Sequence, residues 1–278
     1  MHQIARPIAA EPGPSAVRYT IATLVTNPTQ YEATVRSFRD HGFSPPDCEF
    51  LYLDNTGGNR LSAYSGINRL LEEARGEYVI LCHQDLRLLD DGRTELDARL
   101  AELTAKDANW ALAGNAGGSG PGKLALRISD PHGKDFRVGD LPERVDTLDE
   151  NFIVCKGSAR VALSHDLEGF HFYGTDICLL ADVRGLTAYV IDFHLEHLSG
   201  GTTDAAFWSA ESAFRRKYSR AFRPRWLQTT CALLFLSGYQ VPHILGGALR
   251  SGVQKMARRL PSARGFTDNK PRAGGTGP

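Results

Sequence analysis

The chain lacks the two glycine-rich motifs that most directly indicate phosphate binding in α/β proteins. No G-x-G-x-x-G follows the first expected strand, and G-x-x-x-x-G-K-[ST] occurs nowhere in the 278 residues. The first absence argues against a dinucleotide-binding Rossmann domain, and the second argues against a P-loop nucleotide hydrolase.

Cysteine is scarce and carries no metal-binding spacing. The five cysteines include no C-x-x-C pair, and three of them lie inside apolar runs; they are Cys48, Cys82, Cys155, Cys178 and Cys231. This pattern is typical of reduced, buried thiols in a cytosolic protein. The N-terminus has no apolar run of the kind that a secretory signal needs, so a cytoplasmic location is expected.

Acidic residues are absent from 212–266, which holds eleven Lys or Arg, although the net charge of the chain is zero. This asymmetry suggests a C-terminal part that faces an anionic membrane or substrate, with a solvated basic face as the alternative. Residues 226–249 carry no charge, but interspersed polar residues favour ordinary helix packing over a membrane span. Peripheral contact with the inner membrane face stays open as an alternative.

Hydrophobic periodicity predicts an α/β fold. Apolar runs at 19–25, 48–53 and 77–82 indicate strands, and helical spacing marks 29–41 and 61–75 between them. Strands that alternate with helices predict a mostly parallel sheet flanked by helices.

Further helices are expected at 88–105, 177–184 and 204–218, and further strands at 110–113 and 188–193. The expected organisation is a flexible tail (1–16), an α/β domain (17–220), a helical extension (221–261) and a disordered tail (262–278).

Polar residues follow three of the expected strands. Thr26-Asn27 follows the first strand, Asp54-Asn55 the second, and His83-Gln84-Asp85 the third. In open α/β sheets the ligand binds beyond the carboxyl ends of the strands. A carboxylate at Asp85 can there hold a divalent cation that in turn holds phosphates, or it can simply cap the next segment.

These strand ends, together with Tyr173-Gly174-Thr175-Asp176 and His197 downstream, resemble the family 2 glycosyltransferases of the GT-A fold. The resemblance covers about 19–218 and is strongest to a branch with H-Q-D in place of D-x-D. It implies a GT-A-like, mostly parallel sheet with a C-terminal helical extension. It also implies a nucleoside diphosphate sugar as donor, with a UDP-sugar as the expected form.

The resemblance also implies roles for residues of the donor site. Asp54 would accept a hydrogen bond from the nucleotide base, and Thr26 and Asn27 would line the base and ribose pocket. His83 would lie near the ribose or diphosphate, and Asn55 and Gln84 are assigned to the same donor site.

The remaining roles concern metal and proton transfer. Asp85 would bind Mg²⁺ or Mn²⁺ between the two phosphates, and His197 would complete the metal shell. Asp176 would act as general base, with Asp166 and Glu168 as neighbouring acids that could take the role. His83 departs from the family pattern, because it leaves a single carboxylate in the triplet for the metal.

The expected function is an inverting, metal-dependent glycosyltransferase. The metal neutralises the leaving diphosphate, and a carboxylate removes the proton of the attacking hydroxyl. The acceptor could be a saccharide, a lipid-linked sugar or a small molecule, and no nucleic acid is expected as partner. A sugar nucleotidyltransferase is a second reading, although the loop at Thr26-Asn27-Pro28-Thr29 lacks the Gly and Lys such enzymes show. A non-catalytic binding module on the same fold is a third.

Overall fold

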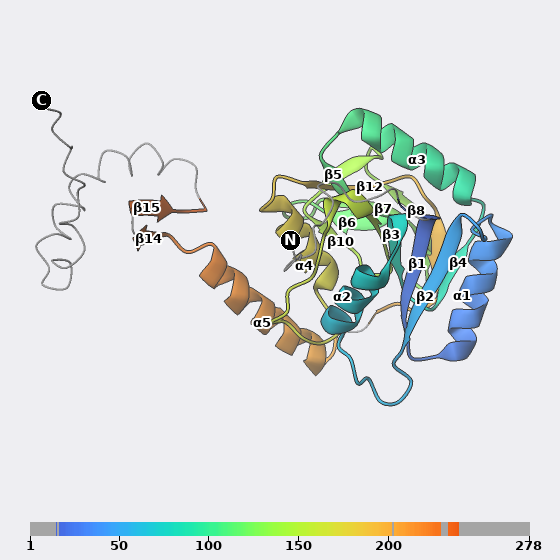
Figure 1. The fold of residues 1–278 in the computed structure, drawn as a ribbon, viewed down its shortest axis with the longest axis horizontal. Coiled ribbons are helices and arrows are strands. Elements are labelled where there is room, and N and C mark those ends of the chain that lie inside the picture. Colours follow the sequence, from blue (N-terminus) through green and yellow to red (C-terminus); the bar gives the residue numbers. More distant parts are fainter. Residues whose placement is uncertain (1–14, 16, 202, 229–232, 239–278) are drawn as a thin grey trace, which may run out of the picture. The chain divides into compact units, whose positions relative to one another are not determined.

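The computed structural model describes residues 15, 17–201, 203–228 and 233–238 (Figure 1). The chain divides into two compact units, Met1–Ala213 and Phe214–Pro278. Every residue of the candidate site belongs to the first unit.

Within the described residues, the first unit is built on a seven-stranded sheet with the order β2-β1-β3-β11-β5-β12-β9. Its strands, in chain order, are β1 (Val17–Val25), β2 (Cys48–Asp54), β3 (Gly76–Cys82), β5 (Trp110–Gly114), β9 (Glu143–Val145), β11 (Phe152–Lys156) and β12 (Thr187–Val190). Five strands run in one direction, and β11 and β9 run against them. The predicted α/β sheet is therefore confirmed.

Alternation along β1 explains how the sheet is covered on both faces. Tyr19 and Ile21 belong to a core that includes Phe38 of one helix and Leu96 and Leu100 of another. Successive strand residues point to opposite faces, so Leu24 faces the other side, where it lies against Gly66. Burial on both faces is what gives β1 its nearly continuous apolar sequence.

Helices flank the sheet (Figure 1). The helices of this unit are α1 (Pro28–Asp40), α2 (Ala63–Glu73), α3 (Arg93–Lys106), α4 (Tyr173–Asp182) and the first part of α5 (Ala205–Ala221). The side chains of α1 and α3 enter the core cluster, whereas α2 contacts β1 and β2, and α4 contacts β12. Asn27 caps α1 by accepting a hydrogen bond from Gln30 N at 3.3 Å, and Ser62 caps α2 in the same way.

A second sheet, whose strands alternate along the chain with those of the first, supplies part of the site. Its order is β10-β6-β7-β13-β4, and β8 pairs with β7. Its strands are β4 (Leu86–Leu88), β6 (Ala116–Gly118), β7 (Leu124–Asp130), β8 (Gly133–Val138), β10 (Thr147–Leu148) and β13 (Leu195–His197). Because β4 follows the H-Q-D triplet directly, whatever pairs with β4 is carried to the end of β3.

Several expected elements differ from the structure. The helix expected from 88 begins only at Arg93, because Leu86–Leu88 pairs with β13 as a strand. Two segments with no expected element also form regular structure: Ala116–Gly118 is β6, and Gly157–Ala159 is a single 3-10 turn. Pairing with distant strands decides the conformation of Leu86–Leu88 and Ala116–Gly118, and the local sequence does not show that pairing.

The second unit holds the end of α5 and a two-stranded hairpin, β14 (Arg225–Gln228) and β15 (Leu233–Leu236). The expected helical extension is therefore wrong for 225–228 and 233–236, where Trp226 packs on Phe235 with ring centroids 4.9 Å apart. Large aromatic and aliphatic side chains favour such a pleated pairing. Most of 237–261, the expected C-terminal tail, and the expected N-terminal tail apart from residue 15 lie outside the described residues. No helix among the described residues is long and apolar enough to cross a membrane.

The four described cysteines, Cys48, Cys82, Cys155 and Cys178, are free and buried. Burial raises the pKa of Cys82 to about 12, and its Sγ lies 3.2 Å from Thr23 Oγ1. The prediction that the cysteines are buried and unpaired is confirmed for these four.

Candidate metal and substrate site

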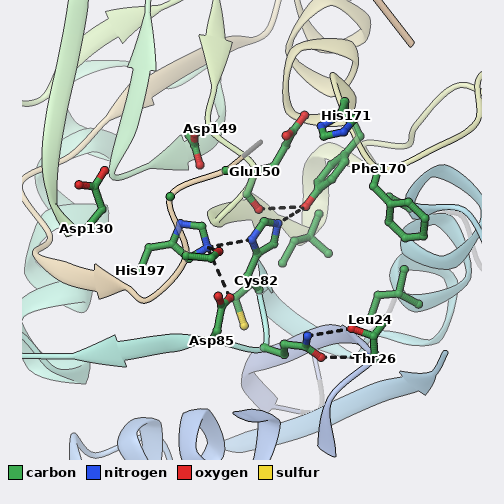
Figure 2. Close-up of a pocket in the computed structure, with 18 of the residues that line it drawn as sticks. Leu24, Thr26, Cys82, Asp85, Asp130, Asp149, Glu150, Phe170, His171 and His197 are labelled. Carbon is green, nitrogen blue, oxygen red and sulfur yellow. Dashed lines mark hydrogen bonds and ion pairs between the residues drawn. The ribbon is translucent and has the colours of Figure 1, made fainter. Parts of the chain in front are cut away.

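A cavity of about 760 Å³ opens where β1 and β3 end (Figure 2). Its apolar wall comes from β1, β3 and α2, and its polar wall comes from the H-Q-D triplet, the 149–150 segment and the end of β13. The polar lining residues are Thr26, His83, Gln84, Asp85, Asp130, His132, Asp149, Glu150, His171, Tyr173, His197, Ser199 and Thr203. A concave site with a few converging polar groups is the usual form of a small-molecule site.

Three side chains converge on one point of this cavity. His83, Asp85 and His197 each offer a ligand atom, and these atoms lie within 4.8 Å of one another. His197 Nε2 is 3.2 Å from His83 Nδ1 and 3.4 Å from an oxygen of Asp85. Figure 2 shows His197 and Asp85 pointing toward each other. Such a cluster could hold a metal ion and leave coordination positions open to the cavity.

Strand pairing brings His197 to the triplet. His197 of β13 is registered with Leu86 of β4, and Leu198 N donates to the Asp85 backbone carbonyl at 3.0 Å. Thr34 of α1 holds the other side of this turn, because its hydroxyl donates to the Gln84 carbonyl at 2.5 Å and accepts from Leu86 N. These backbone contacts fix the turn that carries Asp85 on both sides and hold His197 beside it.

The tautomer of His83 follows from its neighbours. Tyr173 Oη lies 3.0 Å from the Glu150 carbonyl, which can only accept, so the hydroxyl donates there. The same oxygen lies 2.9 Å from His83 Nε2 and must accept the Nε2 proton. The lone pair of His83 therefore sits on Nδ1, the atom that faces His197 and Asp85.

Electrostatics favour the ligand form of this cluster. Burial, assisted by the charge of His197, lowers the pKa of His83 to about 4, so its ring is neutral at neutral pH. Burial opposes ionisation of Asp85, but hydrogen bonding to His197 and its charge outweigh that effect and lower the pKa of Asp85 to about 2. A neutral imidazole and an ionised carboxylate are the forms that bind metal.

Of the residues predicted to bind the donor, Thr26 and Asn27 follow β1 and are both hydrogen-bonded to Gln84, which follows β3. Gln84 Oε1 accepts from the backbone N–H of Thr26 and Asn27, each at 2.8 Å, and Gln84 Nε2 donates to Thr26 Oγ1. Thr26 and Gln84 line the cavity together, whereas Asn27 is not among its lining residues and caps α1. Gln84 therefore ties the end of β3 to the end of β1.

Asp54 and Asn55 lie outside the cavity lining. Asp54 is exposed and accepts hydrogen bonds from the Thr56 backbone N–H and hydroxyl, which lower its pKa. Asn55 is 1% exposed, and its amide donates to and accepts from the backbone of Leu61. Asn55 thus closes the 55–61 loop, and the base-binding role of Asp54 stays a prediction.

Asp176 lies in the first turn of α4 and is fully buried. Its two oxygens accept hydrogen bonds from the backbone N–H and the hydroxyl of Ser164, at 2.8 and 2.7 Å. It is not among the residues that line the cavity. These contacts fit a residue that fixes the 164 loop, and the general-base role of Asp176 stays a prediction.

Glu150 is a cavity carboxylate that the sequence did not single out. It accepts from Gly174 N at the start of α4, and burial, followed by the charge of Asp149, raises the pKa of Glu150 to about 8. Perturbed carboxylates in clefts are frequent at functional sites. The sequence signal was the acid pair Asp149-Glu150, which Asn151 separates from the apolar strand β11.

Three solved structures resemble this chain in backbone course. GalNAc-T7 with UDP, GalNAc and Mn²⁺ gives a TM-score of 0.46 at 10% identity, over 66% of this chain and 44% of that one. S. aureus TarS 1–349 in complex with UDP-GlcNAc gives 0.48 at 11% identity, over 67% and 60%. The mannosyltransferase PcManGT from Pyrobaculum calidifontis, in complex with GDP-Man and Mn²⁺, gives 0.47 at 12% identity, over 77% and 68%. The chain spans less than two thirds of the first two, and likeness at this level says nothing of the site's side chains.

No family model matches the chain. A curated protein of Fuscovulum blasticum, "ATP synthase subunits region ORF 6", is 36% identical over 230 residues, which make up 81% of this chain and 92% of that protein. Its name describes a gene region and not an activity. The chain belongs to the family of this Fuscovulum blasticum ORF 6 protein.

Proposed function

We propose that this protein is a metal-dependent glycosyltransferase that moves a sugar from a nucleoside diphosphate donor, UDP in the first instance, to an acceptor hydroxyl. The observation that carries the proposal is the convergence of His83, Asp85 and His197 on one point of a cavity at the carboxyl end of β3. The family resemblance of the strand-end residues points the same way. The acceptor, and the expected cytoplasmic or inner-membrane location, stay predictions.

The donor set suits a divalent transition metal. Two imidazoles and one carboxylate favour Mn²⁺ over Mg²⁺, which prefers oxygen ligands and retains several waters. No Lys or Arg is among the described residues that line the cavity. A metal bound at the three side chains would therefore supply the positive charge that a leaving diphosphate needs.

The residues of the chain prepare this site for the donor. Tyr173 holds His83 in the tautomer that presents Nδ1, and Leu198 and Thr34 fix the turn around Asp85. Gln84 and Thr26 close the edge of the cavity at the end of β1. Preorganised ligands of this kind reduce the cost of ordering the site on binding.

Glu150 is the carboxylate best placed to accept the acceptor proton. As the acceptor oxygen bonds to the anomeric carbon, the bond from that carbon to the diphosphate breaks and its electron pair leaves with the nucleoside diphosphate. The hydroxyl proton passes to the Glu150 carboxylate, on the cavity wall. With a pKa of about 8, this base would make the rate rise with pH up to that value. Displacement in one such step inverts the anomeric centre.

The test is release of UDP from UDP-sugars. Water can replace the unknown acceptor, so slow hydrolysis of the donor reports the activity. UDP-glucose, UDP-galactose and UDP-GlcNAc are incubated with and without Mn²⁺. We expect UDP release that depends on the metal. Asp85→Asn and His197→Ala should each reduce this release by at least ~100-fold, because loss of a metal ligand should cost more than loss of a residue that only hydrogen-bonds to a ligand. Asp140→Asn, at an exposed aspartate, is the matched control.

Two further variants assign the base. Glu150→Gln should abolish release while UDP binding survives, and Asp176→Asn should lower the thermal midpoint with release per folded molecule retained. The reverse result would return the role to Asp176. Metal-dependent UDP binding without release by any variant would favour a non-catalytic module, and no UDP binding at all would overturn the proposal.

A further inference from the structure

A group of aromatic side chains continues the cavity outward. Phe170, His171 and Phe207 line it, and Phe207 in turn contacts Phe172 and Trp208, with ring centroids 4.9 and 5.2 Å away. We call these five residues the aromatic shelf. Figure 2 shows Phe170 and His171 on the side of the cavity opposite Asp130.

The shelf exposes large apolar area at a fixed position. Trp208 is 59% exposed and Phe170 is 39% exposed. The loop that carries Phe170 is fastened to α2, because Ala63 N donates to the Gly169 carbonyl at 2.9 Å and Tyr64 Oη donates to the His171 carbonyl at 3.0 Å. Exposed aromatic area that adjoins a cavity is typical of a ligand-binding surface.

The polar groups beside the shelf restrict the ligand's charge. Asp130 and Asp149 line the same cavity, and its described lining contains no Lys or Arg. An anionic ligand would meet these carboxylates without a counter-charge from the protein, which disfavours its binding. Hydroxyl groups, in contrast, can donate to the carboxylates.

We propose that the aromatic shelf is the acceptor subsite and that it takes a neutral saccharide. The apolar C–H face of a sugar ring lies on Phe207 and Trp208, while its hydroxyls reach the carboxylates at Asp149 and Glu150. The assignment rests on the proposed function, since it places an acceptor hydroxyl beside the base. It also favours a neutral acceptor over the anionic one that the basic C-terminal sequence suggested.

The test measures saccharide binding without donor or metal. Maltotriose, cellotriose, chitotriose and mannotriose are titrated against the full chain, with trigalacturonate as the anionic probe, by saturation-transfer NMR. We expect at least one neutral trisaccharide to bind, and Trp208→Ala and Phe207→Ala to weaken it by roughly tenfold or more. Tyr52→Ala is the matched control, because Tyr52 is also 59% exposed but lies outside the cavity lining.

Several results would overturn the assignment. These are no binding of any neutral trisaccharide, unchanged binding in both shelf variants with wild-type circular dichroism, or tighter binding of trigalacturonate. Association with phosphatidylcholine vesicles that Trp208→Ala abolishes, without saccharide binding, would make the shelf a lipid contact instead. Because donor and metal are absent, failure here leaves metal-dependent UDP release untouched, and the reverse also holds.

Discussion

At the scale of single residues, Tyr173 has a role that its burial alone would hide. It connects His83 to the Glu150 carbonyl and so determines which imidazole nitrogen faces the metal cluster. Tyr173→Phe should weaken Mn²⁺ binding by about 10–100-fold, measured by calorimetry. Tyr64→Phe removes a hydroxyl with the same 3.0 Å bond to a backbone carbonyl and should leave Mn²⁺ affinity unchanged. Equal losses in both variants would contradict the account.

The raised pKa of Glu150 predicts how the stability of the protein depends on pH. Its pKa of about 8 in the folded chain exceeds the ordinary value of 4.5, so between these values the folded state binds more protons than the unfolded state. The contribution of Glu150 to the free energy of unfolding should therefore fall as pH rises over this range. Because His83, with a pKa of about 4, contributes in the opposite direction below about 6.5, the fall should show between about 6.5 and about 8, where it amounts to about 2 kcal/mol. In Glu150→Gln this fall should disappear, whereas Glu168→Gln, at an exposed glutamate, should keep it. Denaturant titrations at several pH values measure the free energy of unfolding of the three proteins. The same dependence of this free energy on pH in all three would contradict the assignment.

The sequence identified some site residues and missed others for a physical reason. Asp85 ends a buried run, and that pattern depends on a single strand. An Asp or Asn after a strand equally suits a turn, which is what Asp54 and Asn55 make here. Glu150 gains its altered pKa from burial and from Asp149 beside α4, a setting that exists only once distant segments have met.

At the scale of elements, the start of α4 is packed too closely to accept a side chain at Gly174. A Cβ there would lie 2.3 Å from the Leu148 carbonyl oxygen. Gly174→Ala should reduce the free energy of unfolding by about 2–3 kcal/mol, since backbone must move. At Gly66 in α2, an added Cβ would meet only the flexible Leu24 side chain, at 3.0 Å. Gly66→Ala should therefore change the free energy of unfolding by less than about 1 kcal/mol. Urea unfolding measures both, and equal effects would contradict the packing argument.

Whether a segment is a helix or a strand was predictable where the hydrophobic periodicity lies within that one segment. The three first strands and two first helices match their periodicity, because each buries one complete face. The insertion of β11 between β3 and β5, in the opposite direction, has no local signature. The pairing of β13 with β4, which brings His197 to Asp85, is equally a consequence of topology.

At the scale of the whole molecule, every residue of the site lies within Met1–Ala213. A chain that ends after Ala221, the last residue of α5, should therefore bind Mn²⁺ and UDP with affinities within about threefold of the full chain. Calorimetry on the two chains checks this. A loss of more than tenfold, with the circular dichroism of a folded chain, would mean that 222–278 contributes to the site.

The central claim is that His83, Asp85 and His197 hold a metal ion through which a nucleoside diphosphate binds. The most direct measurement is the thermal midpoint of the wild type and Asp85→Asn with UDP, with Mn²⁺ and with both. At a hundredfold excess over the dissociation constant, binding stabilises the folded state by about 2.7 kcal/mol. The account predicts this stabilisation by UDP only when Mn²⁺ is present and only in the wild type. Stabilisation by UDP without Mn²⁺, or equal stabilisation of Asp85→Asn, would contradict it.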